Sequence, residues 1–90
     1  MPYELEPLAR DEFDRELAEL PDGVRASVEG LLEGLSIEPW TSAPMNEANP
    51  GGQYRFLAFA SSDGYGFVTF VVLEAERRVS LVNLLWFPER

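Results

Sequence analysis

Hydrophobic residues follow two different spacings along the chain, and the change between them separates a helical half from a strand-rich half. Over residues 8–35, apolar side chains recur every three or four positions, which predicts amphipathic helices. Over residues 54–87 they form nearly continuous runs rich in β-branched and aromatic side chains, which predicts strands. The pattern therefore indicates an α+β fold in a single domain over residues 1–90.

The helical half contains two predicted helices. Phe13, Leu17 and Leu20 share one face of the first helix, which begins near Leu8. Pro21-Asp22-Gly23 breaks this pattern, and a second apolar stripe then runs through Leu35. Because the break is short, we expect an antiparallel αα-hairpin over residues 8–35 whose apolar faces pack on a sheet.

Three strands are predicted after the helices, at Tyr54–Ala60, Tyr65–Leu73 and Val79–Phe87. Short turns with glycine or charged residues connect them, so the strands form a three-stranded antiparallel sheet. Met1–Glu6 alternates apolar and acidic residues, which predicts a short edge strand. The order of elements is therefore β-α-α-β-β-β, with a long loop over residues 36–53 in which we expect Trp40 to cover an edge of the core.

Alternation along the three strands places their side chains on two faces of the sheet. The first face holds Tyr54, Phe56, Ala58, Phe67, Thr69, Val71, Leu73, Val79, Leu81, Asn83 and Leu85. The second face holds Arg55 and eight apolar residues, namely Leu57, Phe59, Val68, Phe70, Val72, Val82, Leu84 and Trp86. We expect the helices to cover the first face and leave the second open. Because monomers rarely expose large apolar patches, we predict that these eight residues bind a partner.

The net charge of −9 lies entirely in residues 1–50, where twelve acidic residues face three arginines. Such a surface repels phosphate backbones, which argues against binding to mRNA or the ribosome. The chain has no cysteine and no histidine, so we expect no metal site and no cofactor. It has no run of about 20 apolar residues and no secretory pattern, so we expect a cytoplasmic protein that does not cross a membrane.

Several short fragments carry a family resemblance. Leu20-Pro21 is followed shortly by Val24-Arg25, and Gly52-Gln53-Tyr54-Arg55 opens the strand after the long loop. Leu35 and Pro39 mark the end of the second helix, and Tyr65–Phe70 forms the next strand. In this order of elements, the fragments resemble the RelE/ParE toxin superfamily of type II toxin–antitoxin pairs in bacteria. The resemblance covers nearly the whole chain and implies a RelE/ParE-like fold.

The resemblance also implies where catalytic residues would lie. In the ribosome-dependent ribonucleases of the superfamily, basic residues on the open sheet face hold the mRNA phosphate and assist attack by the 2′-OH. Arg55 matches one such arginine, whereas Gly66 stands where another is expected and the final strand carries no basic pair. Arg55, Tyr65 and Arg90 are the catalytic candidates that remain, and most of the ribonuclease set is absent.

Three functions stay open at this point. The chain can be a toxin-fold protein that works by binding, with the second face engaged by an antitoxin-like segment or a second copy. It can be an mRNA-cleaving toxin that uses Arg55 with Tyr65 or Arg90. It can also be a non-toxic dimeric scaffold of the same fold. The loop over residues 36–53, folded back with Trp40, is another possible cover for the second face.

Overall fold

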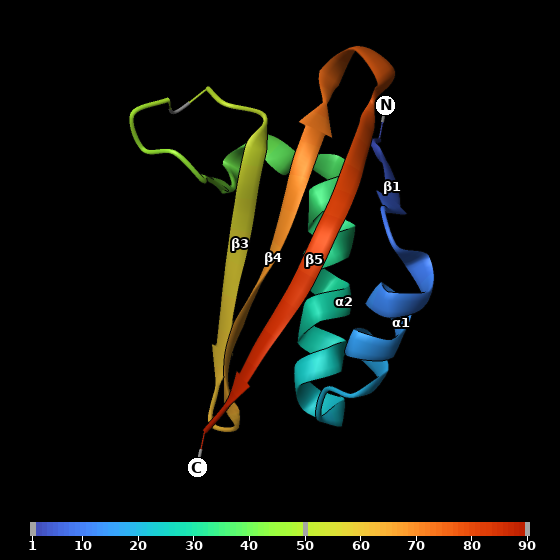
Figure 1. Cartoon of the computed structure of the whole chain (residues 1–90), viewed down its shortest axis with the longest axis vertical. Coiled ribbons are helices and arrows are strands. Elements are labelled where there is room, and N and C mark those ends of the chain that lie inside the picture. The colour runs from blue at the N-terminus through green and yellow to red at the C-terminus, as the bar shows by residue number, and fades with distance from the viewer. Residues whose placement is uncertain (1, 50, 90) are drawn as a thin grey trace.

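A computed structural model, which describes residues 2–49 and 51–89, shows two helices packed on one face of a five-stranded sheet (Figure 1). The strand order is β1-β5-β4-β3-β2. The elements are β1 (Glu4–Pro7), α1 (Arg10–Ala18), α2 (Asp22–Ile37), η1 (Pro39–Thr41), β2 (Ala43–Pro44), β3 (Tyr54–Ser61), β4 (Gly64–Leu73), η2 (Glu74–Glu76) and β5 (Arg78–Pro88). The expected α+β class and order of elements are confirmed, and the second helix extends two residues beyond Leu35.

The N-terminal strand pairs within the chain, which the sequence pattern alone left open. β1 lies parallel to β5, with Glu4 opposite Arg78 and Pro7 opposite Leu81. The backbone N–H of Tyr3 also donates to the carbonyl of Ser36, near the end of α2, at 2.6 Å. The first strand therefore joins the helical half to the last strand of the sheet.

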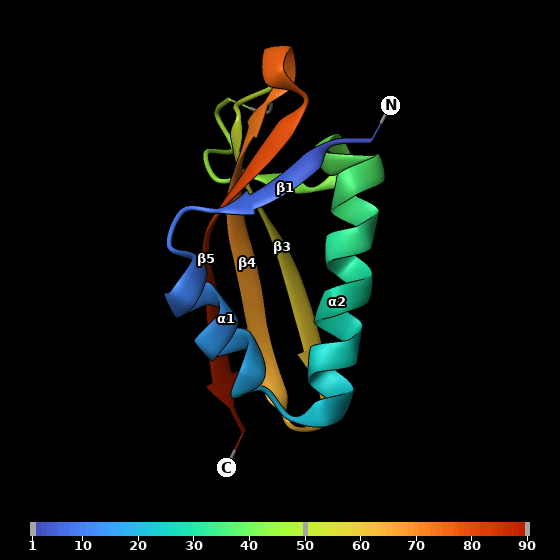
Figure 2. The same cartoon turned by 90° about the vertical axis from the view of Figure 1, so that its right-hand side faces the viewer.

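The core lies between the helices and the sheet. The helices and the short connection between them contribute the apolar stripe that the sequence predicts, and its buried members are Phe13, Leu20, Val24, Val28 and Leu35. The sheet contributes Val68, Phe70, Val72, Val79, Leu81 and Leu84. Figure 2 shows both helices on this side of the strands. Burial of these side chains removes apolar surface from water, which is the main stabilising term in a fold of this size.

The helices cover the face that the sequence analysis assigns as open, so that expectation is wrong. Val68, Phe70 and Val72 are buried at 0–1% exposure beneath the helices. The other predicted partner residues on this face, Leu57, Phe59, Leu84 and Trp86, also belong to the core or pack against it. Alternation separates two faces but does not say which of them the helices cover, because both carry apolar side chains.

A β-bulge explains the remaining errors in the face assignment. Thr69 pairs with Asn83, whereas the next residue of β4, Phe70, pairs with Leu81, so Val82 is an extra residue in β5. The bulge reverses the alternation in the first part of β5. Val79 and Leu81 therefore belong to the core, and Val82 leaves the face to which simple alternation assigns it.

The first part of the long loop over residues 36–53 is ordered against the sheet. It contains the end of α2, the single turn η1 and the two-residue strand β2, whose Ala43 pairs with Phe56 of β3. Trp40 is partly buried against the core, so its expected place at a core edge is confirmed. The loop covers the second face only around Arg55, which contacts Trp40 and Ser42, whereas α1 and α2 lie over the core residues of that face.

Candidate functional site

The face of the sheet opposite the helices is the candidate site, and we call it the open face. It consists of Tyr54, Phe56, Ala58, Tyr65, Phe67, Thr69, Val71, Asn83, Leu85 and Phe87 on β3, β4 and β5. In Figure 1 these strands lie in front of α2, so the open face is turned toward the reader. Regular antiparallel pairing, with Phe67 between Ala58 and Leu85, holds its side chains in fixed rows.

Aromatic rings form a continuous row across the open face. Phe56 and Phe67 meet edge to face with ring centroids 6.3 Å apart. Phe67 lies 6.1 Å from Phe87, and Phe87 stacks on Tyr65 at 5.2 Å. Tyr65 is 57% exposed and Phe87 is 42% exposed. A row of exposed and partly buried aromatic rings held in contact by the sheet is typical of a surface that binds another molecule.

The polar groups of the open face are few and neutral. The hydroxyl of Thr69 donates to the side-chain oxygen of Asn83, which lies directly opposite on β5. This bond satisfies the nearly buried Thr69 within the apolar surface. None of the ten residues that define the open face carries a charge. The site therefore offers apolar contact area and hydrogen-bonding groups, without the positive charge that would stabilise a phosphoryl transition state.

Arg55 points to the helix side and holds the loop after α2. It is 5% exposed, and its Nε donates to Oγ of Ser42 at 3.0 Å. Its guanidinium also donates to the carbonyls of Ser42 and, at 3.0 Å, Gly52. Its Cζ lies 5.2 Å from the ring centroid of Trp40. Planar donors and ring stacking suit arginine to this position, where it ties β3 to the loop.

The structure does not gather the three catalytic candidates into one site. Arg55 is buried on the helix side, whereas Tyr65 is exposed on the open face. Arg90 lies outside the described residues. Gly66, which stands where the resemblance implies an arginine, faces the core between Phe59 and Trp86, and these two rings stack 6.0 Å apart. The glycine leaves room for this stack.

The sequence contains a signal that could have identified the open face. The first face includes Tyr54, Thr69 and Asn83, whose polar groups suit contact with water. The second face has Arg55 as its one polar side chain and is otherwise apolar. In an antiparallel sheet with one covered side, the polar positions mark the uncovered side. The bulge at Val82 conceals this signal in β5, because it moves Val79 and Leu81 to the covered side.

A polar cluster surrounds Glu74, at the end of the sheet where η2 connects β4 to β5. Trp40 Nε1 donates to Oε1 of Glu74 at 2.7 Å, and Arg77 donates to Oε2 at 3.0 Å. The hydroxyl of Tyr3 also donates to Oε1. This bond from Tyr3, followed by the bond from Trp40, lowers the pKa of Glu74, and accordingly the pKa of Tyr3 is raised. Glu74 is therefore held in a network, although its side chain remains 48% exposed.

The described part of the chain contains no group of three acidic residues placed to hold a metal ion. Within the same residues, 2–49 and 51–89, no helix is long and apolar enough to cross a membrane. The open face is thus a protein surface built from neutral side chains, many of them aromatic. The Glu74 network is built from hydrogen-bonded polar side chains.

Comparison with solved structures identifies the fold. The chain is similar to the E. coli toxin RelE, solved as a mutant in the free state, with a TM-score of 0.69. The match covers 93% of this chain and 82% of that chain at 16% sequence identity. No protein-family model matches the chain, and no curated protein sequence matches it. The expected RelE-like toxin fold is therefore confirmed by the structure, at an identity that shows the fold alone.

Proposed function

We propose that this chain is a cytoplasmic toxin-fold protein of a bacterial toxin–antitoxin-type pair and that it acts through protein binding at its open face. The observation that carries the proposal is the row of aromatic rings formed by Phe56, Phe67, Phe87 and Tyr65, of which Phe87 and Tyr65 are exposed and the other two are partly buried. The RelE-like fold supports the toxin–antitoxin context, because the similar E. coli protein RelE is a toxin.

The chemistry of the open face favours an amphipathic segment of an antitoxin-like partner. Such a segment would lay its apolar side on the aromatic row, as helices do in hydrophobic grooves. A second copy of the chain is less favoured, because two molecules with a charge of −9 repel each other. We therefore expect the partner segment to be neutral or basic around an apolar centre.

The same geometry gives the ribonuclease alternative little support. Arg55 donates hydrogen bonds to Ser42 and Gly52 on the helix side, so it is not presented to a substrate on the open face. Tyr65 is accessible, but the open face around it carries no charged side chain that could neutralise a phosphate. We therefore assign catalysis no part in the proposed function.

Growth of a bacterial culture after induction of the chain tests the proposal. We expect the wild-type chain to arrest growth and the double variant Phe67→Glu, Phe87→Glu to lose this effect. The matched control is Leu8→Glu, Ile37→Glu, which places two glutamates at apolar positions that are 69% and 73% exposed away from the open face. The control should still arrest growth, because it adds the same charge elsewhere.

Soluble, folded wild-type protein that leaves growth unchanged would contradict the toxin role. Arrest that survives the open-face substitutions, with both variants folded by circular dichroism, would contradict the role of that face. Cleavage of mRNA by purified protein and ribosomes would favour the catalytic alternative. A stable homodimer in analytical ultracentrifugation, together with no toxicity, would favour the scaffold alternative.

A further inference from the structure

The outer edge of β5 is only partly covered. β1 pairs with Arg78–Leu81, and the last bond on this side runs from the N–H of Leu8 to the carbonyl of Leu81 at 2.9 Å. The chain then turns into α1. Beyond Leu81, no described strand pairs with the outer edge, although β5 continues through Pro88 and stays paired with β4 on its inner side. Figure 2 shows α1 beside this part of the sheet.

This uncovered edge, residues 82–88, lacks most of the features that normally prevent edge pairing. It carries no lysine and no charged side chain before its final proline, and four of its residues are large and apolar: Leu84, Leu85, Trp86 and Phe87. The bulge at Val82 lies at its start, and regular pairing with β4 follows from Asn83 onward. A long, regular, apolar strand edge is a template for an added strand.

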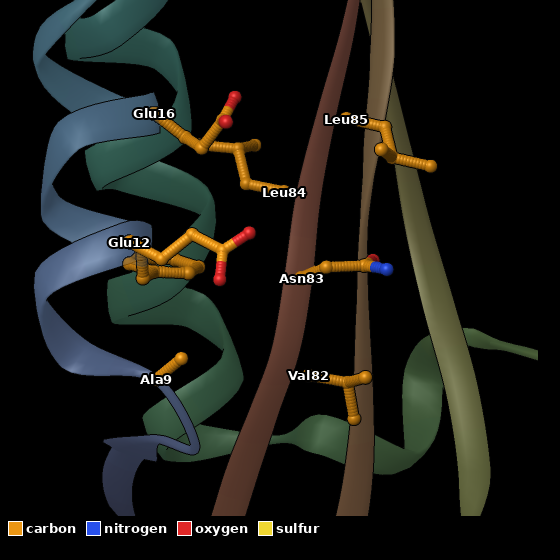
Figure 3. Close-up of a pocket in the computed structure, with 8 residues that line it drawn as sticks. Ala9, Glu12, Glu16, Val82, Asn83, Leu84 and Leu85 are labelled. Carbon is orange, nitrogen blue, oxygen red and sulfur yellow. The ribbon is translucent and has the colours of Figure 1, made fainter.

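A cavity of about 160 Å³ lies beside this edge, between α1 and β5. Phe13 and Leu84 contribute its apolar wall, and Glu12 and Glu16 contribute two carboxylates. Figure 3 shows Glu12 and Glu16 extending from α1 toward β5, while Leu84 extends from β5 toward α1. Asn83 points to the opposite side of β5. A strand added along the edge would therefore pass directly by two acidic side chains.

The charge beside the edge selects the kind of strand that can bind. No ion pair among the described residues uses Glu12 or Glu16, so both carboxylates are available to a partner. A basic side chain of an added strand would form charge-assisted bonds with them. Edge pairing with a second copy would instead bring two chains of charge −9 together.

We propose that the edge of β5 from Val82 to Phe87, with Glu12 and Glu16, binds an extended segment of a partner protein that alternates apolar and basic residues. Main-chain bonds to the edge would supply affinity, and the two glutamates would select basic side chains. This site shares Asn83, Leu85 and Phe87 with the open face, but it uses the backbone edge of β5 and the two glutamates of α1 instead of the aromatic row, so it does not depend on the proposed toxin role.

The test uses the full chain and a synthetic peptide, Val-Arg-Val-Arg-Val-Arg-Val, acetylated and amidated at its ends. Binding is measured by titration, and its location by hydrogen exchange of backbone amides. We expect the peptide to slow exchange in residues 82–87 and a peptide with Glu in place of each Arg to have no effect. The double variant Glu12→Gln, Glu16→Gln should bind the arginine peptide roughly tenfold more weakly.

The matched control is Glu29→Gln, Glu33→Gln, which removes the same charge at the same spacing from exposed positions of α2. It should bind the peptide as the wild type does. Equal weakening by both double variants would mean that the net charge of the chain, and not the position of Glu12 and Glu16, determines peptide binding, and it would overturn the proposal. Slowed exchange on β3 instead of β5 would place the peptide elsewhere and also overturn it. Concentration-dependent slowing of residues 82–87 without peptide would assign the edge to a second copy of the chain.

Discussion

Tyr3 donates its phenolic hydrogen to Oε1 of Glu74, a residue 71 positions further along the chain. Trp40 donates to the same oxygen at 2.7 Å, and the guanidinium of Arg77 lies 4.1 Å from the centroid of the Tyr3 ring. One carboxylate therefore connects the N-terminal segment, the turn after α2 and the connection between β4 and β5. The backbone N–H of Glu4 also donates to the carbonyl of Arg77 at 2.9 Å, so these contacts together fix one end of the sheet.

Glu74→Gln should change how stability depends on pH. The pKa of Glu74 is lowered in the folded protein, so its contribution is present above the ordinary value of 4.5 and is lost as pH falls through the folded pKa. We therefore expect the stability difference between wild type and variant to be largest near neutral pH and to shrink below about pH 4.5. Urea unfolding at a series of pH values measures it.

Tyr3 adds a second, alkaline limit to the same network. Its pKa is raised, so its contribution is present below the ordinary value of 10.0 and is lost as pH rises through the folded pKa.

The control for Glu74→Gln is Glu29→Gln, at an exposed position of α2, which should keep the wild-type dependence of stability on pH. A constant difference between wild type and Glu74→Gln from pH 3 to pH 8 would show that the charge of Glu74 is unimportant.

Arg55→Ala should destabilise the fold by about 2–4 kcal/mol. The substitution leaves the carbonyls of Ser42 and Gly52 without their donor and removes the guanidinium that stacks on Trp40. Arg55→Lys should recover little of this, because one ammonium cannot reproduce the planar set of donors. Chemical denaturation measures the effect, and the exposed Arg15→Ala should change stability by less than about 0.5 kcal/mol. An Arg55→Ala protein as stable as wild type would contradict the structural role.

Gly66→Ala should destabilise the protein by roughly 1–3 kcal/mol through overpacking. A Cβ at this position would lie 2.2 Å from the carbonyl oxygen of Leu85 and 2.8 Å from the ring of Phe59. Gly30→Ala is the matched control, because a Cβ there meets no atom within 4 Å and alanine favours the helix. We expect the control to gain about 0.5–1 kcal/mol in thermal or urea unfolding. Opposite signs for the two substitutions are the result to look for, and equal effects would place Gly66 outside the core.

Phe70→Ala should cost about 3–5 kcal/mol, because its side chain is fully buried beneath the helices. Phe87→Ala removes the same side chain from the open face, where 42% of the residue is exposed, and should cost less than about 1.5 kcal/mol. The two variants, compared by denaturant unfolding, show which face is covered. A larger loss for Phe87→Ala would mean that the helices cover the other side of the sheet.

The sequence by itself determined the fold class, the order of elements and the membership of the helix stripe. Spacings of three or four residues place Phe13, Val24 and Val28 on buried helix faces, and continuous β-branched runs define β4 and β5. These features follow from local periodicity, which depends only on the geometry of helices and strands. The acidic, cysteine-free composition likewise follows directly from the residues.

Only the tertiary structure decided which face of the sheet is open. Both faces carry apolar side chains, so the packing of α1 and α2, and not the alternation, buries Phe70 and exposes Phe87. The bulge at Val82 and the hydrogen bond between Tyr3 and Glu74 depend on pairings between distant segments. Such pairings leave no local periodic signal, because their energy appears only once the strands are aligned. The candidate site could therefore be identified only from the register and packing of the sheet, whereas the fold could be predicted from the hydrophobic pattern of the sequence.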